Sequence, residues 1–224
     1  MSGLEMEIAP DLVGKVRLGV FALDGLRVNE QDVALAAEVE AAAAELRSRH
    51  GGGRSAEVPG AADARSLYKA LGLDPTKTRP SNEALVRRVL KGEALSRVNT
   101  LVDALNLCSL RYQLPFGLYD LSRIRPPVVL RKGRPGESYE GIRKGPVSVE
   151  GRPTLADQEG PFGNPTSDSA RTMITLRTAA ALVTCYAPAA FALARLREVL
   201  EGTEATITRH CGGRRTDQRV LPGS

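Results

Sequence analysis

The pattern of apolar residues changes at Pro115, and this change sets the strongest limit on how the chain can fold. Before that proline, apolar residues recur at helical spacing over residues 29–50, 63–72, 81–92 and 98–110. After it, short apolar runs such as V-V-L-R, P-T-L-A-D and A-L-V-T-C-Y stand between glycines and prolines, which is typical of strands. Helices followed by a sheet predict an α+β fold.

Elements outside these two blocks can also be predicted. Residues 15–23 alternate, so we expect a strand with one buried face that carries Val16, Leu18 and Val20. Asn29 is the expected N-cap of the first helix. The remaining expectations are a strand over 172–177, a helix over 189–200 that ends at Gly202, a strand over 203–209 and a mobile basic tail over 211–224. No internal repeat or linker divides the chain, so we expect one domain over residues 1–210.

The composition argues against several kinds of site. Aromatic residues make up 4% of the 224 residues and tryptophan is absent, which argues against a nucleic-acid surface built mainly on base stacking. The cysteines lie far apart, and the histidines are only His50 and His210. We therefore expect no zinc site, no Ser-His-Asp or Cys-His catalytic set, no metal and no cofactor.

Charge and hydropathy give weaker limits. A net charge of +5 favours a polyanionic partner without requiring one. The longest apolar stretch, residues 178–194, lies between Arg177 and Arg195, contains Pro188 and is too short to span a bilayer. With no C-x-x-C pair among three cysteines, we expect a cytoplasmic protein without a membrane segment.

A long, ordered series of residues resembles a known family. R-S-L-Y-K-A-L-G-L-D-P-T-K-T-R-P-S-N-E-A-L-V-R-R-V-L-K-G is followed by V-N-T-L-V-D-A-L-N-L-C-S-L, and then by P-F-G-L-Y-D-L-S-R-I, V-V-L-R-K-G-R-P-G-E and L-A-D. The series resembles the B3/B4 domain, the tRNA-editing module of the phenylalanyl-tRNA synthetase β subunit, which also occurs as free-standing proteins of about this length. The resemblance covers residues 63–186.

This resemblance implies a three-layer β/β/α fold with a mixed sheet, and hydrolysis of an amino acid wrongly esterified to tRNA. A chain of 224 residues has no room for the catalytic domain of the synthetase, so the implied activity is a deacylase acting in trans on the aminoacylated acceptor end. Where the synthetase reads Pro-Leu-His-Ala-Phe-Asp, this chain reads P-F-G-L-Y-D, so Gly117 replaces the editing-site histidine. The run over 160–172 also lacks an equivalent, and we expect a changed substrate.

Ester hydrolysis needs a positioned water, donors for the developing oxyanion and groups that hold the amino acid and the terminal ribose. Because an aminoacyl ester is already activated, Asn, Asp, Thr and Ser side chains with backbone amides can suffice. Asn99, Asp103 and Asn106 share one helix face, where they could bind substrate or cap the helix and tie down nearby loops. We expect a pocket between the 99–110 helix and residues 157–175, with Asp103, Asn106, Asp168 and Thr175 as the catalytic groups.

The expected substrate-binding groups lie mainly around the same pocket. Asp157 ends a strand, where a carboxylate either faces a ligand or caps a turn. The loop N-P-T-S-D-S carries several short polar side chains, and its alternative is a solvated turn. Tyr68 could line the pocket entrance or be a core-edge aromatic with its hydroxyl in water. The full set is Tyr68, Asp157, Thr166, Ser167, Ser169 and Arg171.

Basic residues are densest between positions 77 and 97. They could hold acceptor-stem phosphates through salt-dependent contacts without sequence readout, or form an ordinary solvated face. The expected tRNA-binding set is Lys77, Arg79, Arg87, Arg88, Lys91 and Arg97.

Other functions remain open on the sequence alone. A non-catalytic module of the same fold could bind an amino acid or tRNA, since a fold alone never establishes activity. The 29–50 helix could instead bind a partner protein. Asp103, Asp157 and Asp168 would suit a cationic side chain, and some free-standing relatives are associated with removal of an arginine analogue such as canavanine. The same carboxylates could equally hold only the α-ammonium group of any aminoacyl ester.

Overall fold

The computed structural model describes residues 4–222 of the chain. Its helices are α1 (Val33–His50), α2 (Ala61–Ala70), α3 (Ser81–Leu90), α4 (Thr100–Tyr112) and α5 (Leu193–Cys211). Its strands are β1 (Met6–Ile8), β2 (Val16–Leu26), β3 (Phe116–Asp120), β4 (Val128–Lys132), β5 (Ser138–Glu140), β6 (Pro146–Ser148), β7 (Pro153–Asp157), β8 (Gly160–Gly163), β9 (Ala180–Pro188) and β10 (Gly212–Leu221). Short 3-10 turns lie at η1 (Ser55–Glu57), η2 (Leu121–Arg123) and η3 (Ala170–Thr172).

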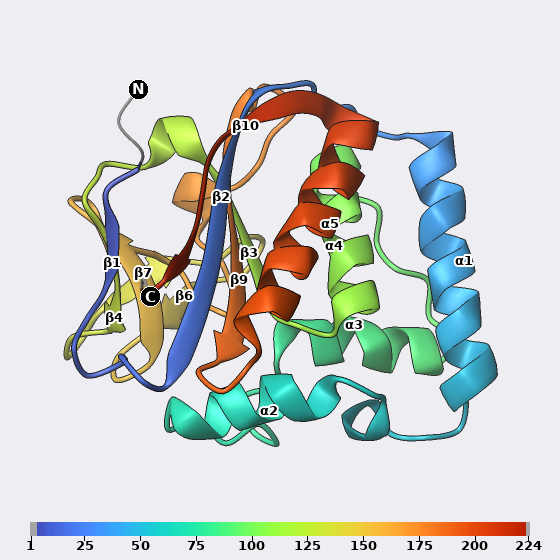
Figure 1. The fold of residues 1–224 in the computed structure, drawn as a ribbon, viewed down its shortest axis with the longest axis horizontal. Coiled ribbons are helices and arrows are strands. Elements are labelled where there is room, and N and C mark those ends of the chain that lie inside the picture. The colour runs from blue at the N-terminus through green and yellow to red at the C-terminus, as the bar shows by residue number, and fades with distance from the viewer. Residues whose placement is uncertain (1–3, 223–224) are drawn as a thin grey trace.

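These elements form three layers (Figure 1). An outer sheet has the strand order β1-β4-β7-β8, and a middle sheet has the order β10-β2-β9-β3. Helices α5 and α4 lie on the other side of the middle sheet, with α1 and α3 beyond them. The outer sheet is mixed, because β1 runs parallel to β4 whereas β4 and β7 are antiparallel. The expected α+β fold with β/β/α layers is therefore confirmed.

The middle sheet is buried on both faces. Leu18 and Val20 of β2 belong to the core between the two sheets, whereas Phe21 and Leu23 belong to the core under the helices. The expectation of one buried face is therefore wrong, because the outer sheet covers one face of β2 and the helices cover the other.

No helix among residues 4–222 is both long and apolar enough to cross a membrane.

Two helix starts are set by side-chain caps. The carboxylate of Asp32 accepts a hydrogen bond from the Leu35 N–H at 2.8 Å, so α1 starts after Asp32 and the expectation that Asn29 caps it is wrong. Asn99 caps α4 in the same way by accepting from the Val102 N–H at 3.0 Å.

Helix α5 corrects two expectations near the C-terminus. It continues through Gly202, where a Cβ would overlap the Tyr112 hydroxyl, so this glycine allows close packing of α4 against α5 instead of ending a helix. The expected strand over 203–209 is helical. Its threonine hydroxyls are accommodated because Thr203 and Thr206 donate to the carbonyls of Val199 and Gly202, one turn earlier.

Two other segments also differ from expectation. Residues 212–221 of the expected tail form β10, which pairs antiparallel with β2 from Gly212 opposite Leu26 to Leu221 opposite Leu18; residues 223–224 lie outside the described residues. The expected strand over 172–177 is instead the end of η3 followed by a turn, because the Thr178 hydroxyl accepts from the Thr175 N–H at 2.9 Å and donates to Asp120 at 2.7 Å.

Candidate functional site

A cavity of about 1010 Å³ lies between α4, β3 and residues 168–176, with the tip of the β5–β6 hairpin at its mouth. Asn106 of α4 lines one side, and Asp168 and Thr175 line another. The side chains of Phe116 and Leu118 contribute an apolar wall from β3. The cavity therefore brings together three of the four catalytic groups expected from the sequence.

Asp168 has unusual surroundings for a carboxylate. Part of the residue reaches the cavity, but its Oδ1 atom is buried and accepts no hydrogen bond from residues 4–222. Burial raises the pKa of Asp168 to about 7, although the Tyr119 hydroxyl opposes the rise. A carboxyl group with this pKa can accept or release a proton near neutral pH, which is the property of a general base.

Buried hydroxyl groups lie between the sheets near Asp168. Within the described part of the chain, the hydroxyls of Tyr119, Thr184 and Tyr186 have no hydrogen-bond partner. A Cβ at Gly117 would overlap the Tyr119 and Thr184 hydroxyls. The Tyr119 phenol therefore occupies the space that a side chain at position 117 would need. The sequence reasoning missed this group, although the changed residues of P-F-G-L-Y-D were its signal.

Asn106 and Thr175 have donors available for a ligand. The Asn106 side chain is half-buried, and its carboxamide makes no hydrogen bond to any residue that the structure describes. The Thr175 oxygen accepts from the Arg177 N–H at 3.2 Å, and the acceptor nearest to its hydroxyl proton is the Thr178 oxygen, at a long distance of 3.5 Å. Both side chains can therefore donate toward an oxygen atom in the cavity.

Asp103 lies outside the lining of the cavity. Its carboxylate is buried and accepts from the Val98 N–H at 3.1 Å, and burial raises the pKa of Asp103. We therefore assign it to holding the segment that precedes α4. The capping alternative describes Asn99 and Asp103, whereas only Asn106 of the helical stripe is left without a structural hydrogen bond among residues 4–222.

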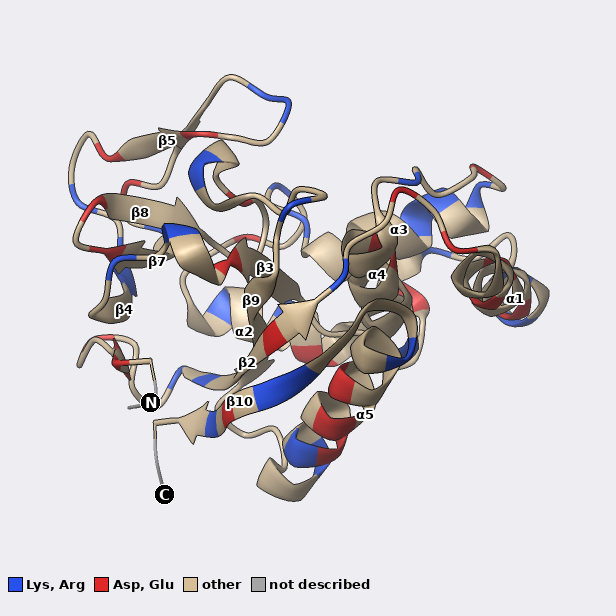
Figure 2. Ribbon diagram, turned by 90° about the horizontal axis from the view of Figure 1, so that it is seen from above, with Lys and Arg blue, Asp and Glu red and all other residues tan. Residues whose placement is uncertain are grey.

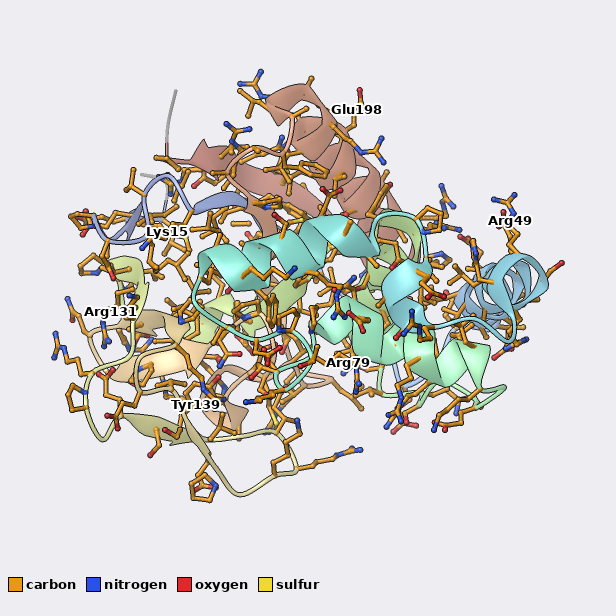
Figure 3. All side chains as sticks on the ribbon, turned by 90° about the horizontal axis from the view of Figure 1, so that it is seen from below. Lys15, Arg49, Arg79, Arg131, Tyr139 and Glu198 are labelled. Atoms are coloured by element: carbon orange, nitrogen blue, oxygen red, sulfur yellow. The ribbon has the colours of Figure 1, made fainter. Side chains whose placement is uncertain are left out.

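The N-P-T-S-D-S loop is organised by its own hydrogen bonds. The Asn164 oxygen accepts from the N–H groups of Thr166 and Ser167 at 2.8 and 2.9 Å, and its amide donates to Tyr139. The Tyr139 hydroxyl in turn donates to the Ser167 carbonyl at 2.6 Å. Tyr139 is labelled in Figure 3. The Ser169 hydroxyl oxygen accepts from the Arg171 N–H at 3.1 Å. These polar groups hold the loop, and Thr166, Ser167 and Ser169 do not line the cavity.

The other expected substrate-binding groups also have structural partners. Asp157 and Arg171 form an ion pair at 2.8 Å, and the Asp157 side chain is fully buried, with a further bond from the Arg125 N–H. The Tyr68 hydroxyl lies 2.8 Å from both the Pro165 carbonyl and the Thr166 hydroxyl, so the expectation that it lies in water is wrong. Neither the ion pair nor Tyr68 lines the cavity.

The expected tRNA-binding residues divide around α3. Arg79, Arg87 and Lys91 line a second hollow of about 530 Å³ beside α3, and Arg79 is labelled in Figure 3. Arg97 lines the first cavity and lies 3.8 Å from Glu40. Lys77 and Arg88 lie outside the linings of both hollows. The basic residues thus extend from one hollow toward the other instead of forming one compact patch.

No cysteine or histidine among residues 4–222 lines the cavity. Among residues 4–222, no group of three or more His, Cys, Asp and Glu side chains could hold a metal ion. Burial raises the pKa of the Cys108 thiol to about 11, so this thiol stays protonated near neutral pH. His210 lies at the end of α5 between Asp32 and Glu38, at 3.4 and 3.2 Å.

The chain belongs to the B3/4 domain family, whose model matches residues 63–207. It is also similar to a solved structure described as an N-terminal fragment of the phenylalanyl-tRNA synthetase β subunit from Pyrococcus horikoshii, with a TM-score of 0.50 and 13% identity. That match covers 99% of this chain and 55% of the other, and at this identity it concerns the fold. No curated protein matches the chain.

Proposed function

We propose that this protein is a deacylase that hydrolyses the ester of a mischarged aminoacyl-tRNA in trans, within the cavity between α4 and residues 168–176. The observation that carries the proposal is Asp168, whose pKa of about 7 suits a general base on the wall of a cavity that also presents Asn106 and Thr175. Membership of the B3/4 domain family supports a substrate connected with tRNA.

The proposed reaction uses water as the nucleophile. Ionised Asp168 accepts a proton as the water oxygen bonds to the ester carbonyl carbon, and the bond from that carbon to the ribose oxygen then breaks. The ribose oxygen takes up this proton from Asp168 as it leaves, which restores the ionised carboxylate. The Asn106 amide and the Thr175 hydroxyl donate hydrogen bonds to the oxyanion that develops on the carbonyl oxygen.

Basic residues would hold the acceptor end of the tRNA outside the cavity. Arg79, Arg87 and Lys91 line the neighbouring hollow, and α3 separates them from the cavity wall that Ser81 and Leu85 form. Contacts of guanidinium and ammonium groups with phosphates weaken steeply as salt concentration rises. We therefore expect salt-dependent binding without preference for the sequence of the acceptor stem.

A second candidate is a non-catalytic module that binds an amino acid or tRNA. The observation that favours it is Gly117, which offers no side chain at the position where the resembled synthetase pattern has histidine. On this alternative Asp168 would hold the ammonium group of the ligand, and no ester would be cleaved.

The two candidates are separated by incubating the protein with a panel of mischarged tRNAs and measuring loss of the ester. The deacylase proposal predicts clearance of at least one ester and a loss of about 100-fold or more in the Asp168→Asn variant. Asp11→Asn is the matched control, because Asp11 is exposed and lies outside the cavity lining. Binding of tRNA with no ester cleared across the panel would favour the module.

A further inference from the structure

Exposed apolar side chains gather at the mouth of the cavity. Among residues 4–222, the large apolar side chains that are exposed are Val13, Val33, Val98, Ile142, Met173 and Leu176. The last four all line the cavity, and we call them the apolar rim. Such side chains are unremarkable when scattered, but a group of them around one opening indicates a surface that a ligand covers.

The apolar rim is assembled from distant parts of the chain. Val98 precedes α4, Ile142 lies at the tip of the β5–β6 hairpin, and Met173 and Leu176 follow η3. Figure 2 shows the hairpin projecting from the body of the protein, with basic residues at its tip. Because three separate segments bring apolar groups to the same opening, the rim is a product of the fold and not of one apolar run in the sequence.

Cationic side chains stand beside the rim. Arg97 and Arg143 both line the cavity, and Lys144 follows Arg143 on the exposed hairpin tip. Arg97 is within 3.8 Å of Glu40, whereas Arg143 forms no ion pair with any residue that the structure describes. A ligand that matches this mouth needs a flat apolar part for the rim and an anionic part for a guanidinium group.

We propose that the apolar rim binds the base of the terminal nucleoside of tRNA, and that Arg143 contacts the phosphate of that nucleotide. The proposal rests on the proposed function, in which the ester on the terminal ribose lies beside Asp168. The base attached to the same ribose then extends away from the ester, toward the mouth of the cavity. In a chain with few aromatic residues, aliphatic side chains provide the contact with the faces of the base through close packing.

The test compares two 5′-labelled trinucleotides with the full-length protein. One is CCA, and the other has an abasic ribose in place of the terminal adenosine. We expect the parent to bind CCA about tenfold more tightly than the abasic probe, measured by fluorescence anisotropy. The Ile142→Ser/Met173→Ser variant should lose this preference, because it removes half of the apolar rim.

A matched control is the Val13→Ser/Val33→Ser variant, which removes two exposed apolar side chains that do not line the cavity. It should keep the full preference for CCA. The Arg143→Gln variant should weaken both probes by the same factor, since a phosphate contact does not depend on the terminal base. Unchanged melting temperatures will show that the variants are folded.

Several results would overturn the proposal. These are a parent that binds both probes equally, a rim variant that keeps the preference, or a parent dimer that the rim substitutions convert to a monomer in light scattering. If base-dependent binding is found but no ester is cleared, the proposed function fails and the rim proposal stands. If esters are cleared without any contribution from the base, only the rim proposal fails.

Discussion

Two polar regions meet at Asp168, and they differ in what their hydrogen bonds do. On one side, residues 164–171 form a loop in which Asn164 and Ser169 accept from N–H groups of the loop itself and Arg171 pairs with Asp157. On the other side, Asn106 has a carboxamide without a partner among the described residues, and the Thr175 hydroxyl has only a long contact of 3.5 Å with the Thr178 hydroxyl as its acceptor. The polar side chains of the loop are used by the fold, whereas the cavity wall keeps donors that a ligand can use.

Residue type alone therefore does not distinguish a binding loop from a structural one. Short polar side chains serve both purposes, and what distinguishes them is whether the fold already satisfies their hydrogen bonds. We therefore assign a structural role to the loop and a role in catalysis to Asp168 and the cavity wall. Variants on the two sides should separate these properties.

The largest expected effect comes from pH and the Asp168→Asn variant. The pKa of Asp168 rises from 3.8 in the unfolded chain to about 7 in the fold, so between these values the folded state binds more protons than the unfolded state. The free energy of unfolding therefore falls as pH rises through this range. The fall is up to about 4 kcal/mol, at 1.36 kcal/mol per pH unit.

Because asparagine cannot ionise, the Asp168→Asn variant should not show this fall in stability as pH rises. Urea unfolding from pH 4 to pH 8 should show the variant gaining on the parent as pH rises, with other titrating groups cancelling in the comparison. A constant difference between the two proteins across this range would mean that Asp168 titrates normally.

The Arg171→Ala variant should have the next largest effect. It removes the partner of Asp157, whose side chain is fully buried, and an uncompensated carboxylate there should lower the free energy of unfolding by about 3 kcal/mol. Because Arg171 does not line the cavity, the turnover rate of the folded fraction should be unchanged. A variant of parental stability that has lost turnover would place Arg171 in substrate binding instead.

The two asparagines give the sharpest paired test. Asn164→Ala removes three hydrogen bonds from the loop and should cost about 2 kcal/mol of stability, with little change in turnover. Asn106→Ala should change stability by only about 0.5 kcal/mol and lower turnover. Chemical unfolding and single-turnover assays on the same preparations would check both, and the reverse pattern would exchange the roles of the two regions.

The smallest expected effect is that of Tyr119→Phe. Its hydroxyl lowers the pKa of Asp168, so removing it should move the titration of Asp168 to higher pH. Stability should change by about 1 kcal/mol or less, which is the usual net contribution of one neutral hydroxyl group. NMR of the Asp168 carboxyl carbon would measure the shift, and an unchanged midpoint would show that the two groups do not interact.

The periodicity of the sequence was sufficient to predict an α+β fold and most of the elements, whereas the three layers were implied by the family resemblance. It failed where a long-range contact decides the outcome. Gly202 reads as a helix end, but the approach of Tyr112 makes it part of a continuous helix. The tail reads as mobile because its strand, β10, is recognisable only when β2 is beside it.

The position of the candidate site could be predicted from the sequence, but not all of the residues that form it. The spacing on α4 placed Asn106 correctly at the cavity, yet it gave Asp103 equal weight, because the hydrogen bond from Val98 depends on how the preceding segment turns. Neither the Tyr119 hydroxyl beside Gly117 nor the rim residue Ile142 could be recognised from spacing, because both depend on the approach of distant segments.

The pH dependence of single-turnover ester hydrolysis tests the central role of Asp168 most directly. With a mischarged tRNA that the parent clears, the rate should rise with pH and level off above the pKa of about 7. The Asp168→Asn variant should be about 100-fold slower or more, without that rise. A variant that follows the parental profile at the parental rate would contradict the assignment of Asp168 as the base.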